Sequence, residues 1–369
     1  EEADSVFYGV VQTATRSLVE DNGADVLQRV AVMCTDGITR TVNVDKSLNY
    51  PAGWMVRIDV TPEGENVTAI ENRTISGTVS ADATMLGDHK LADDVQILDT
   101  TTEGVAGTVR PSRLSGTKLN MLNVRYYTLN DNGEIDRLIL NDVTGDLWKY
   151  GVLDDIRNIA ANLPSTKTPA TAGDSEGEGS DAATGVLKDL RSVLVPTTSE
   201  ILWGVINGDI LQTVWNKVTS STGSLVSIGV KQLAKVVGEP YGTILNYVGG
   251  GATYVCYVNG QLTSYTTSIK YPVLAGGLAV RQEVNGSVKA MIQLMPMKID
   301  KVGAASVLSG STRYEVADNA QVYLWYKGQY YATKLAEVNS DDYYLTGWYD
   351  NFGCAAGKRV RVIVAVKKD

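Results

Sequence analysis

The stretch LADDVQIL, residues 91–98, occurs twice in this chain, and its second copy is VADNAQVY, residues 316–323. The two copies align without a gap, and both carry Ala-Asp followed by Gln at the same offsets. Eight residues alone would be weak support for a relationship. Other matches flank the stretch in the same order on both sides, so we interpret the sequence as a long internal duplication.

The flanking matches extend the duplication over most of the chain. Cys34 precedes an Asp-Gly pair and Cys256 precedes an Asn-Gly pair, and both pairs favour tight hairpin turns. We therefore expect the two cysteines to occupy equivalent places. The other matched segments, first copy before second, are 7–11 with 149–153, 50–53 with 271–276, 56–60 with 280–284, and 123–126 with 359–362. The last match implies that the second copy ends one hairpin arm early.

These matches divide the chain into three segments. We expect residues 1–147 to form the first β repeat and residues 246–369 to complete the second. Residues 148–245 would hold the start of the second repeat together with an acidic loop and a helical insertion. The segment 203–206 is an alternative start for the second copy, which would move its boundary without changing the duplication.

Short strands separated by turn signals predict a mainly β protein with minor α content. Alternating segments such as 55–60 and 123–129 are followed by turn sequences at 62–64 and 132–133. Such signals recur at roughly 8–12 residue spacing, which is typical of β-sandwiches and barrels. We therefore expect two duplicated β-sandwich or barrel-like domains, the second of which carries the short helical insertion.

The insertion differs in composition from the rest of the chain. Residues 164–181 are rich in Ser, Thr, Gly, Pro and acidic residues, so we expect a mobile, protease-sensitive loop there. Apolar residues recur at helical spacing over 186–237, which predicts short helices packed on the β core, with Trp203 and Trp215 buried. A membrane-surface role for these stripes is disfavoured because their cationic face is thin.

Composition narrows the classes of function. The chain has 369 residues, enough for two or three domains, and a net charge of −9, which argues against binding to the phosphates of nucleic acids. No run of 18 apolar residues is present, so we expect no transmembrane segment. The three cysteines cannot all pair within one chain, and we expect them to behave as small buried hydrophobes.

Motifs for catalysis or metal binding are weak. The single histidine, His89, has no Gly-x-Ser-x-Gly motif to accompany it, and the cysteines lack the spacing of a zinc site. Residues 130–136 resemble a calcium loop, but the matching frame puts Thr128 and Ile139 at ligand positions, so a hairpin turn is favoured. We expect no catalytic residue, no metal and no cofactor.

Two carboxylate doublets, Asp93-Asp94 and Asp341-Asp342, are the remaining candidates for acid-base chemistry. Adjacent residues of a strand face opposite sides, so neither doublet is a ready acid-base pair. The recurrence of Asp93 as Asp318 also favours a structural role in both copies.

Aromatic residues concentrate near the end of the second copy. Exposed rings of this kind can stack on the C–H faces of sugars, whereas the alternative is ordinary packing in the core and between strands. The first copy lacks most of these rings, so a binding site would belong to the second copy alone. The candidate ligand-binding residues are Tyr323, Trp325, Tyr326, Tyr330, Tyr331 and Trp348.

The sequence also resembles a known family in several of these segments. The residues that carry the resemblance are 124–127, 132–135, 143–151 and 253–260, together with the segment around Trp215. They are similar to the repeated β regions of large cell-surface proteins of Gram-positive clostridia that also carry S-layer homology repeats. The S-layer homology motif itself is not in this chain. The resemblance implies an exported protein of the Gram-positive cell envelope, of which this chain is the C-terminal part, and it supplies no catalytic residues.

Three functions follow as expectations, from different classes. The first is a non-enzymatic surface module with a structural, adhesion or assembly role. The second is a glycan- or peptide-binding module that uses the aromatic residues of the second copy, with cell-wall glycan or other surface proteins as partners. The third, least favoured, is a carboxylate-based hydrolase.

Overall fold

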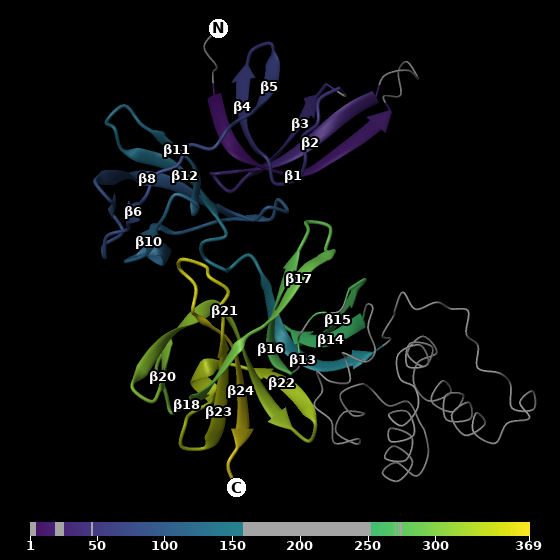
Figure 1. Ribbon diagram of the computed structural model, residues 1–369, viewed down its shortest axis with the longest axis vertical. Helices are drawn as coiled ribbons and strands as arrows, with labels where there is room; N and C mark the ends of the chain where they lie inside the picture. Colours follow the sequence, from purple (N-terminus) through teal and green to yellow (C-terminus); the bar gives the residue numbers. More distant parts are fainter. Residues whose placement is uncertain are drawn as a thin grey trace, which may run out of the picture. The chain divides into compact units, whose positions relative to one another are not determined.

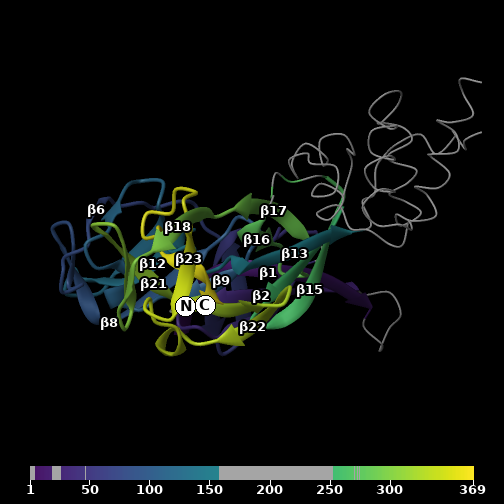
Figure 2. The same ribbon diagram turned by 90° about the horizontal axis from the view of Figure 1, so that it is seen from below.

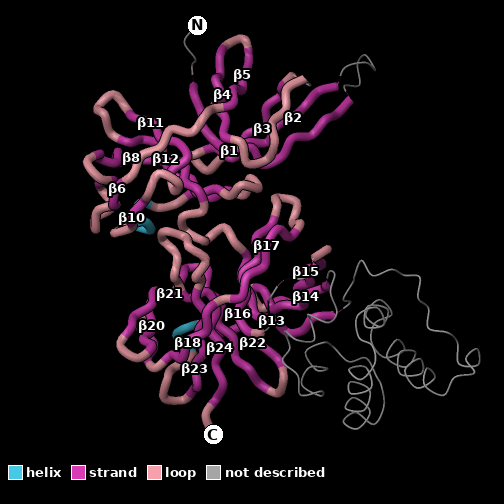
Figure 3. Tube along the Cα trace, viewed as in Figure 1, coloured by secondary structure: helices cyan, strands magenta, loops and turns pink. Residues whose placement is uncertain are grey.

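The computed structural model of the chain describes residues 5–18, 26–45, 47–157, 252–269, 271, 273 and 275–369 (Figure 1). Within these ranges every regular element is a β-strand, apart from two short 3-10 turns (Figure 3). The expectation of a mainly β protein is therefore confirmed. The loop expected at 164–181 and the helices expected at 186–237, with Trp203 and Trp215, lie outside the described residues.

The chain forms two compact units. Unit 1 consists of 1–149, 281–289 and 350–358, and unit 2 consists of 150–280, 290–349 and 359–369. In the described part of the chain, no helix has the length and apolarity needed to span a lipid bilayer.

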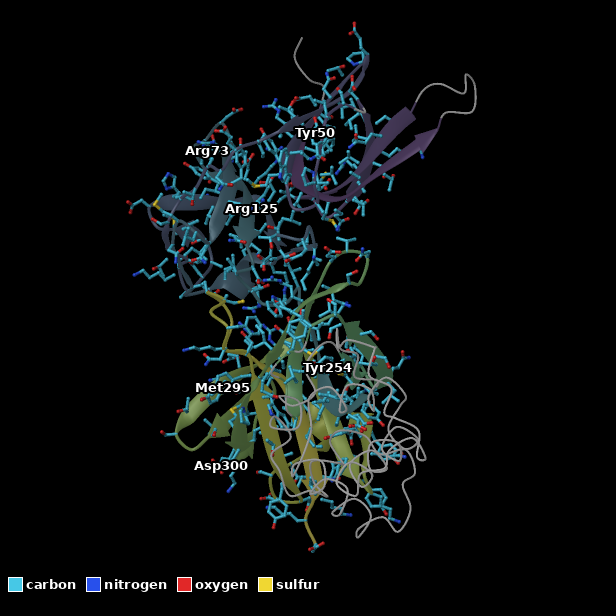
Figure 4. The ribbon with its side chains drawn as sticks, turned by 45° about the vertical axis from the view of Figure 1, so that its right-hand side comes forward. Tyr50, Arg73, Arg125, Tyr254, Met295 and Asp300 are labelled. Atoms are coloured by element: carbon cyan, nitrogen blue, oxygen red, sulfur yellow. The ribbon has the colours of Figure 1, made fainter. Side chains whose placement is uncertain are left out.

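The first sheet of unit 1 is antiparallel, with the order β3-β2-β1-β4-β5. Its strands are β1 (Ser5–Leu18), β2 (Val26–Cys34), β3 (Thr39–Val44), β4 (Met55–Thr61) and β5 (Gly64–Ala69). The sheet curls around a core that includes Val11, Val32, Tyr50 and Ile58. Tyr50, labelled in Figure 4, lies in the loop between β3 and β4. Alternating apolar residues in these strands produce that buried face.

The second sheet of unit 1 has the order β11-β12-β8-β7, with β9 also paired to β8. Its strands are β7 (Met85–Leu86), β8 (His89–Thr100), β9 (Ala106–Thr108), β11 (Val124–Leu129) and β12 (Ile135–Asn141). A small ladder of β6 (Gly77–Thr78) and β10 (Lys118–Leu119) and the turn η1 (Pro111–Leu114) complete the unit. One face of this sheet packs with the first sheet through Tyr8, Met55 and Ile139. The other face forms a separate core with Leu86, Leu114 and Leu119.

The first sheet of unit 2 has the order β15-β14-β13-β16-β17 (Figure 2). Its strands are β13 (Lys149–Arg157), β14 (Ala252–Val258), β15 (Gln261–Thr267), β16 (Gly276–Gln282) and β17 (Val288–Gln293). This order is the order of the first sheet of unit 1, strand for strand. Even the irregularity is shared, because β1 skips Gln12 and β13 skips Asp154 at the same step of the pairing with the next strand.

The second sheet of unit 2 has the order β18-β23-β24-β21-β20-β19, with β22 also paired to β21. Its strands are β18 (Met295–Ile299), β19 (Lys301–Val302), β20 (Ser306–Ser309), β21 (Thr312–Tyr326), β22 (Gln329–Thr333), β23 (Tyr343–Tyr349) and β24 (Val360–Lys367), and η2 (Leu335–Glu337) follows β22. One face of this sheet carries a core that includes Val322, Leu345 and Ile363.

The stretch that decided the sequence interpretation occupies the same place in both units. It lies in β8 and β21, and each of these long strands pairs in parallel with the last strand of its sheet, β12 or β24. Leu91 pairs with Ile135 and Gln96 with Arg137, so five steps along β8 match two steps along β12. The same irregularity separates Val316 and Gln321 in β21. The two repeated stretches therefore lie in equivalent strands and have the same register with their parallel partners.

The repeated glutamine has a structural reason. In unit 1 the Thr35 hydroxyl, in the turn after β2, donates a hydrogen bond of 2.7 Å to Gln96 Oε1. In unit 2 the backbone N–H of Asn259, in the turn after β14, donates one of 2.9 Å to Gln321 Oε1. The glutamine therefore ties the second sheet of each unit to the turn between β2 and β3 in unit 1, and to the turn between β14 and β15 in unit 2.

Two of the sequence matches were wrong. The segment 359–362 was aligned with 123–126, but β24 corresponds to β12 because both are the parallel partners of the repeated strand. The second copy therefore includes the hairpin arm that we expected it to lack. Cys34 and Cys256 are also not equivalent, because β1 pairs Gly9 with Cys34, whereas β13 pairs Leu153 with Cys256 two residues further along. Both thiols are nevertheless buried, as expected of small hydrophobes.

Candidate functional site

The hairpin of β21 and β22 carries five of the six candidate binding residues. Lys327 and Gly328 form its turn with φ of 47° and 82°, the conformation that a two-residue hairpin turn requires. Trp325 is paired with Tyr330 across the hairpin, and Leu324 with Tyr331. Paired residues share a face and neighbouring residues alternate, so the hairpin presents two different aromatic faces.

Tyr323 lies in the interior of unit 2 and is only 1% exposed. Its hydroxyl donates to the carbonyl oxygen of Tyr257 and to Gln321 Oε1, and it accepts from the backbone N–H of Gly260. Burial raises the pKa of Tyr323 above its ordinary value. This side chain therefore supports the site from beneath, and it is not available to a ligand.

Trp325 and Tyr330 lie on the same face of the hairpin as Tyr323. Their ring centroids are 4.9 Å apart, with the ring planes tilted by 49°. Tyr330 also packs against Tyr257 of β14, at 5.4 Å between centroids. Tyr330 is half-buried and Trp325 is 37% exposed, so the pair is anchored at one side and open at the other.

This pair continues into a row across four neighbouring strands. The last parallel pair of β21 and β24 is Leu324 with Ala365, so Trp325 and Val366 are the next residues on the two strands, and Val366 is paired with Tyr344 of β23. We call Tyr330, Trp325, Val366 and Tyr344 the aromatic row. Val366 is 38% and Tyr344 64% exposed. Four strands at the normal spacing give the row a length of about 14 Å.

Charged and polar groups lie at the two ends of the row. The negative charge of Asp154, in the β13 irregularity, is near enough to Tyr257 and Tyr330 to affect their ionisation. Burial, followed by the charge of Asp154, raises the pKa of Tyr330 to about 12, so its phenol is protonated at neutral pH. At the other end, Lys368 Nζ lies 5.2 Å from the centre of the Tyr344 ring and donates a hydrogen bond to the Ser340 carbonyl oxygen.

The other three candidate residues are not part of the row. Tyr326 and Tyr331 are 58% and 48% exposed, but they lie on the opposite face of the hairpin. Trp348 is in β23 and packs on the backbone of β16 at Gly276 and Gly277. A side chain at either glycine would collide with Trp348. The structure thus joins Trp325 and Tyr330 in one surface and separates Tyr326, Tyr331 and Trp348 from it.

Sequence reasoning missed part of the row. Val366 and Asp154 were not candidates, and Tyr344 was not singled out as part of a site. Tyr344 and Val366 alternate with residues of the apolar core, Leu345 and Ala365. The available signal was a short strand with apolar or aromatic residues on both faces. That pattern does not show which of the two faces the partner sheet leaves uncovered.

In the described part of the chain, the residues considered for catalysis lie in strand β8 and in a turn. His89 begins β8 and pairs with Leu86 across the turn. Asp93 and Asp94 are exposed within the repeated irregularity of β8. Asp342 belongs to a turn in which the Asn339 side-chain amide donates to Asp342 Oδ2 at 2.9 Å. Among the described residues, no group of three or more His, Cys, Asp or Glu side chains could hold a metal ion.

Two further carboxylates, Asp99 and Asp142, lie close together in unit 1. Asp99 is fully buried, and its oxygens accept hydrogen bonds from the N–H groups of Thr100, Val143 and Thr144 and from the Thr144 hydroxyl. Burial raises its pKa. The three bonds from Val143 and Thr144 hold the segment after β12 against β8, so this carboxylate fixes the backbone rather than facing a substrate.

Asp142 has an uncommon backbone conformation, with φ of 46°. Its carboxylate accepts hydrogen bonds of 2.9 and 3.2 Å from Trp148 Nε1, and the Trp148 ring stacks on Phe352 at 4.3 Å. Burial raises the pKa of Asp142 to about 6, and the nearby negative charges of Asp99 and Glu103 act in the same direction.

The hairpin interpretation of residues 130–136 is confirmed. The side-chain oxygen of Asn130 accepts hydrogen bonds from the backbone N–H groups of Asn132 and Glu134, and Gly133 has φ of 73°. These bonds form the turn between β11 and β12, where the amide oxygen that a calcium site would use is already engaged. Arg125 of the same hairpin donates to the Thr100 hydroxyl and the Gly53 carbonyl, and it lies within unit 1 in Figure 4.

Comparison of the chain with protein-family models, curated proteins and solved structures gave no match.

Proposed function

We propose that this protein is a non-enzymatic module of a bacterial cell envelope, with a structural, adhesion or assembly role. The observation that carries the proposal is that polar side chains hold the strands and turns of the two units together. The repeated Gln96 and Gln321, and the buried Asp99, are each engaged in holding strands and turns together. The glutamine contact, made in both units, favours a spacer or scaffold over a reaction centre.

The resemblance to β regions of clostridial surface proteins supplies the location in this proposal. The chain would be displayed outside the cell as the C-terminal part of a larger S-layer-type protein. Its net charge of −9 is compatible with an exported protein and disfavours binding to nucleic acid.

The experiment for this proposal is labelling of intact cells that produce the protein. Antibodies raised against the purified chain should bind unpermeabilised cells, and brief treatment with an external protease should remove the signal. A cytosolic enzyme serves as the internal control for lysis. Detection of the antigen only after permeabilisation would contradict the proposed location.

A second candidate is a binding module, and the aromatic row is the observation that favours it. Three of its four side chains are at least 37% exposed on one face of a sheet. A hydrolase is less supported, because the doublets Asp93-Asp94 and Asp341-Asp342 lie in an exposed strand irregularity and a turn. Loss of hydrolysis upon mutation of either doublet, with the fold retained, would favour the enzyme instead.

A further inference from the structure

The rings of the aromatic row are arranged with a defined spacing. Trp325 and Tyr344 are the two exposed rings, and the strand between them contributes only Val366. Two steps between neighbouring strands separate the rings by about 10 Å along the row. This separation is about the length of one disaccharide in a β-1,4-linked chain, in which every second sugar presents the same face.

The surroundings of the row favour a neutral ligand with many hydroxyl groups. The row itself contains no Asp, Glu, Lys, Arg or His side chain, and the cation beside it is Lys368, whose Nζ lies 5.2 Å from the centre of the Tyr344 ring. The excess of acidic residues in the chain, with a net charge of −9, repels polymers rich in phosphate or carboxylate. The Tyr330 and Tyr344 phenols can exchange hydrogen bonds with hydroxyl groups at the rim of the row.

From this complementarity we infer that the aromatic row binds a neutral β-1,4-linked glycan, with alternate sugars stacked on Trp325 and Tyr344. Val366 fills the space beneath the intervening sugar, and Tyr330 supports the Trp325 ring from the side. The inference rests on the adhesion role proposed above and gives it a ligand class. A peptide is the less favoured ligand, because a peptide added to the edge of β22 would run along that strand at the Tyr330 end of the row and would not cross Trp325 and Tyr344.

Isothermal titration of the complete chain with chitohexaose and cellohexaose tests the inference, with α-1,4-linked maltohexaose as the control ligand. We expect binding of at least one β-linked hexamer, and weaker or no binding of maltohexaose. Trp325→Ala and Tyr344→Ala should each weaken binding by roughly tenfold or more, as truncation of an aromatic anchor does. Trp325→Phe should retain part of the affinity, since it keeps a ring.

Matched control variants are available on the other face of the same hairpin. Tyr326→Ala and Tyr331→Ala remove rings of comparable exposure and should leave the affinity unchanged. Circular dichroism and the unfolding midpoint of every variant identify losses caused by misfolding.

Three results would overturn the inference: no binding of either β-linked hexamer, equal binding of maltohexaose, or equal losses from the Tyr326 and Trp325 variants. Binding of a wall peptide with the same dependence on Trp325 and Tyr344 would also overturn it. Labelling of intact cells is independent of these titrations. A labelled cell surface without glycan binding therefore rejects only the glycan, and glycan binding by an intracellular protein rejects only the location.

Discussion

Replacing Asp142 by asparagine should make unit 1 more stable at neutral pH and remove part of its pH dependence. The carboxylate lies in a mostly buried site where burial, together with the nearby charges of Asp99 and Glu103, opposes ionisation. Asparagine keeps an oxygen that can accept the Trp148 Nε1 hydrogen bond, and it tolerates the positive φ of 46° at this position.

The size of the effect follows from the pKa. Burial raises the pKa of Asp142 from 3.8 to about 6, and a difference of that size corresponds to about 3 kcal/mol at most. Because the folded state holds the proton more tightly, this stabilisation is fully present below pH 3.8 and is lost as the pH rises through about 6. The natural chain should therefore lose stability from this group between pH 4 and pH 7, and Asp142→Asn should not.

Two measurements check this prediction. The free energy of unfolding of unit 1 can be followed with urea at pH 5 and pH 8, where Asp142→Asn should gain roughly 1–1.5 kcal/mol more relative to the natural chain at pH 8 than at pH 5. The indole N–H resonance of Trp148, identified by its absence in a Trp148→Phe variant, should shift with a midpoint near pH 6 in the natural chain. The same resonance should not titrate in the asparagine variant.

Either of two results would refute the reasoning. An Asp142→Asn chain that is equally destabilised at both pH values would show that the carboxylate is required as an anion. A Trp148 resonance that titrates near pH 4 would show that the site does not penalise ionisation.

Three further predictions concern the frame of the two units. Gly151→Ala should destabilise unit 2 by about 1–3 kcal/mol, because a Cβ there would collide with the Tyr257 carbonyl oxygen; an unchanged urea midpoint would contradict this. Gln321→Ala should cost about 1–3 kcal/mol and more than Gln96→Ala, since it removes bonds to the Asn259 N–H, the Tyr150 carbonyl oxygen and the Tyr323 hydroxyl, and equal losses in urea unfolding would count against the proposed role. His89→Ala should leave the unfolding midpoint and glycan titrations unchanged, because this residue only begins β8; a loss of binding with the fold retained would assign it a function.

The duplication could be predicted from the sequence because the repeated stretch lies where the structure allows few residue types. The stretch 91–98 recurs because β8 interrupts its parallel pairing with β12 there. Its glutamine must also reach the turn between β2 and β3 of the other sheet. Gly9 and Gly151 were also matched correctly, since a Cβ at either position would collide with the backbone of the next strand. Positions of this kind allow few residue types, so their pattern persists.

The pairing between strands that are far apart in the chain could not be predicted from the sequence. The segments 123–126 and 359–362 look alike because both have apolar and Arg residues in alternation, yet one begins β11 and the other begins β24. Short alternating strands share this pattern, and only the register of their partners distinguishes them. The binding surface shows the same limit, since nothing local to Val366 or Tyr344 indicates that the covering sheet ends before it reaches them.

The parallel pairing of β21 with β24 has a mechanical consequence. Strand β24 lies between β21, to which it is parallel, and β23, to which it is antiparallel. A pull along β24 from its Lys367 end slides it lengthwise between its two neighbours, so the hydrogen bonds on both sides carry the load together. Strand β12 is held in the same way between β8 and β11 in unit 1. Each unit is therefore loaded in shear along this strand, and its ladder must break as a whole instead of opening bond by bond.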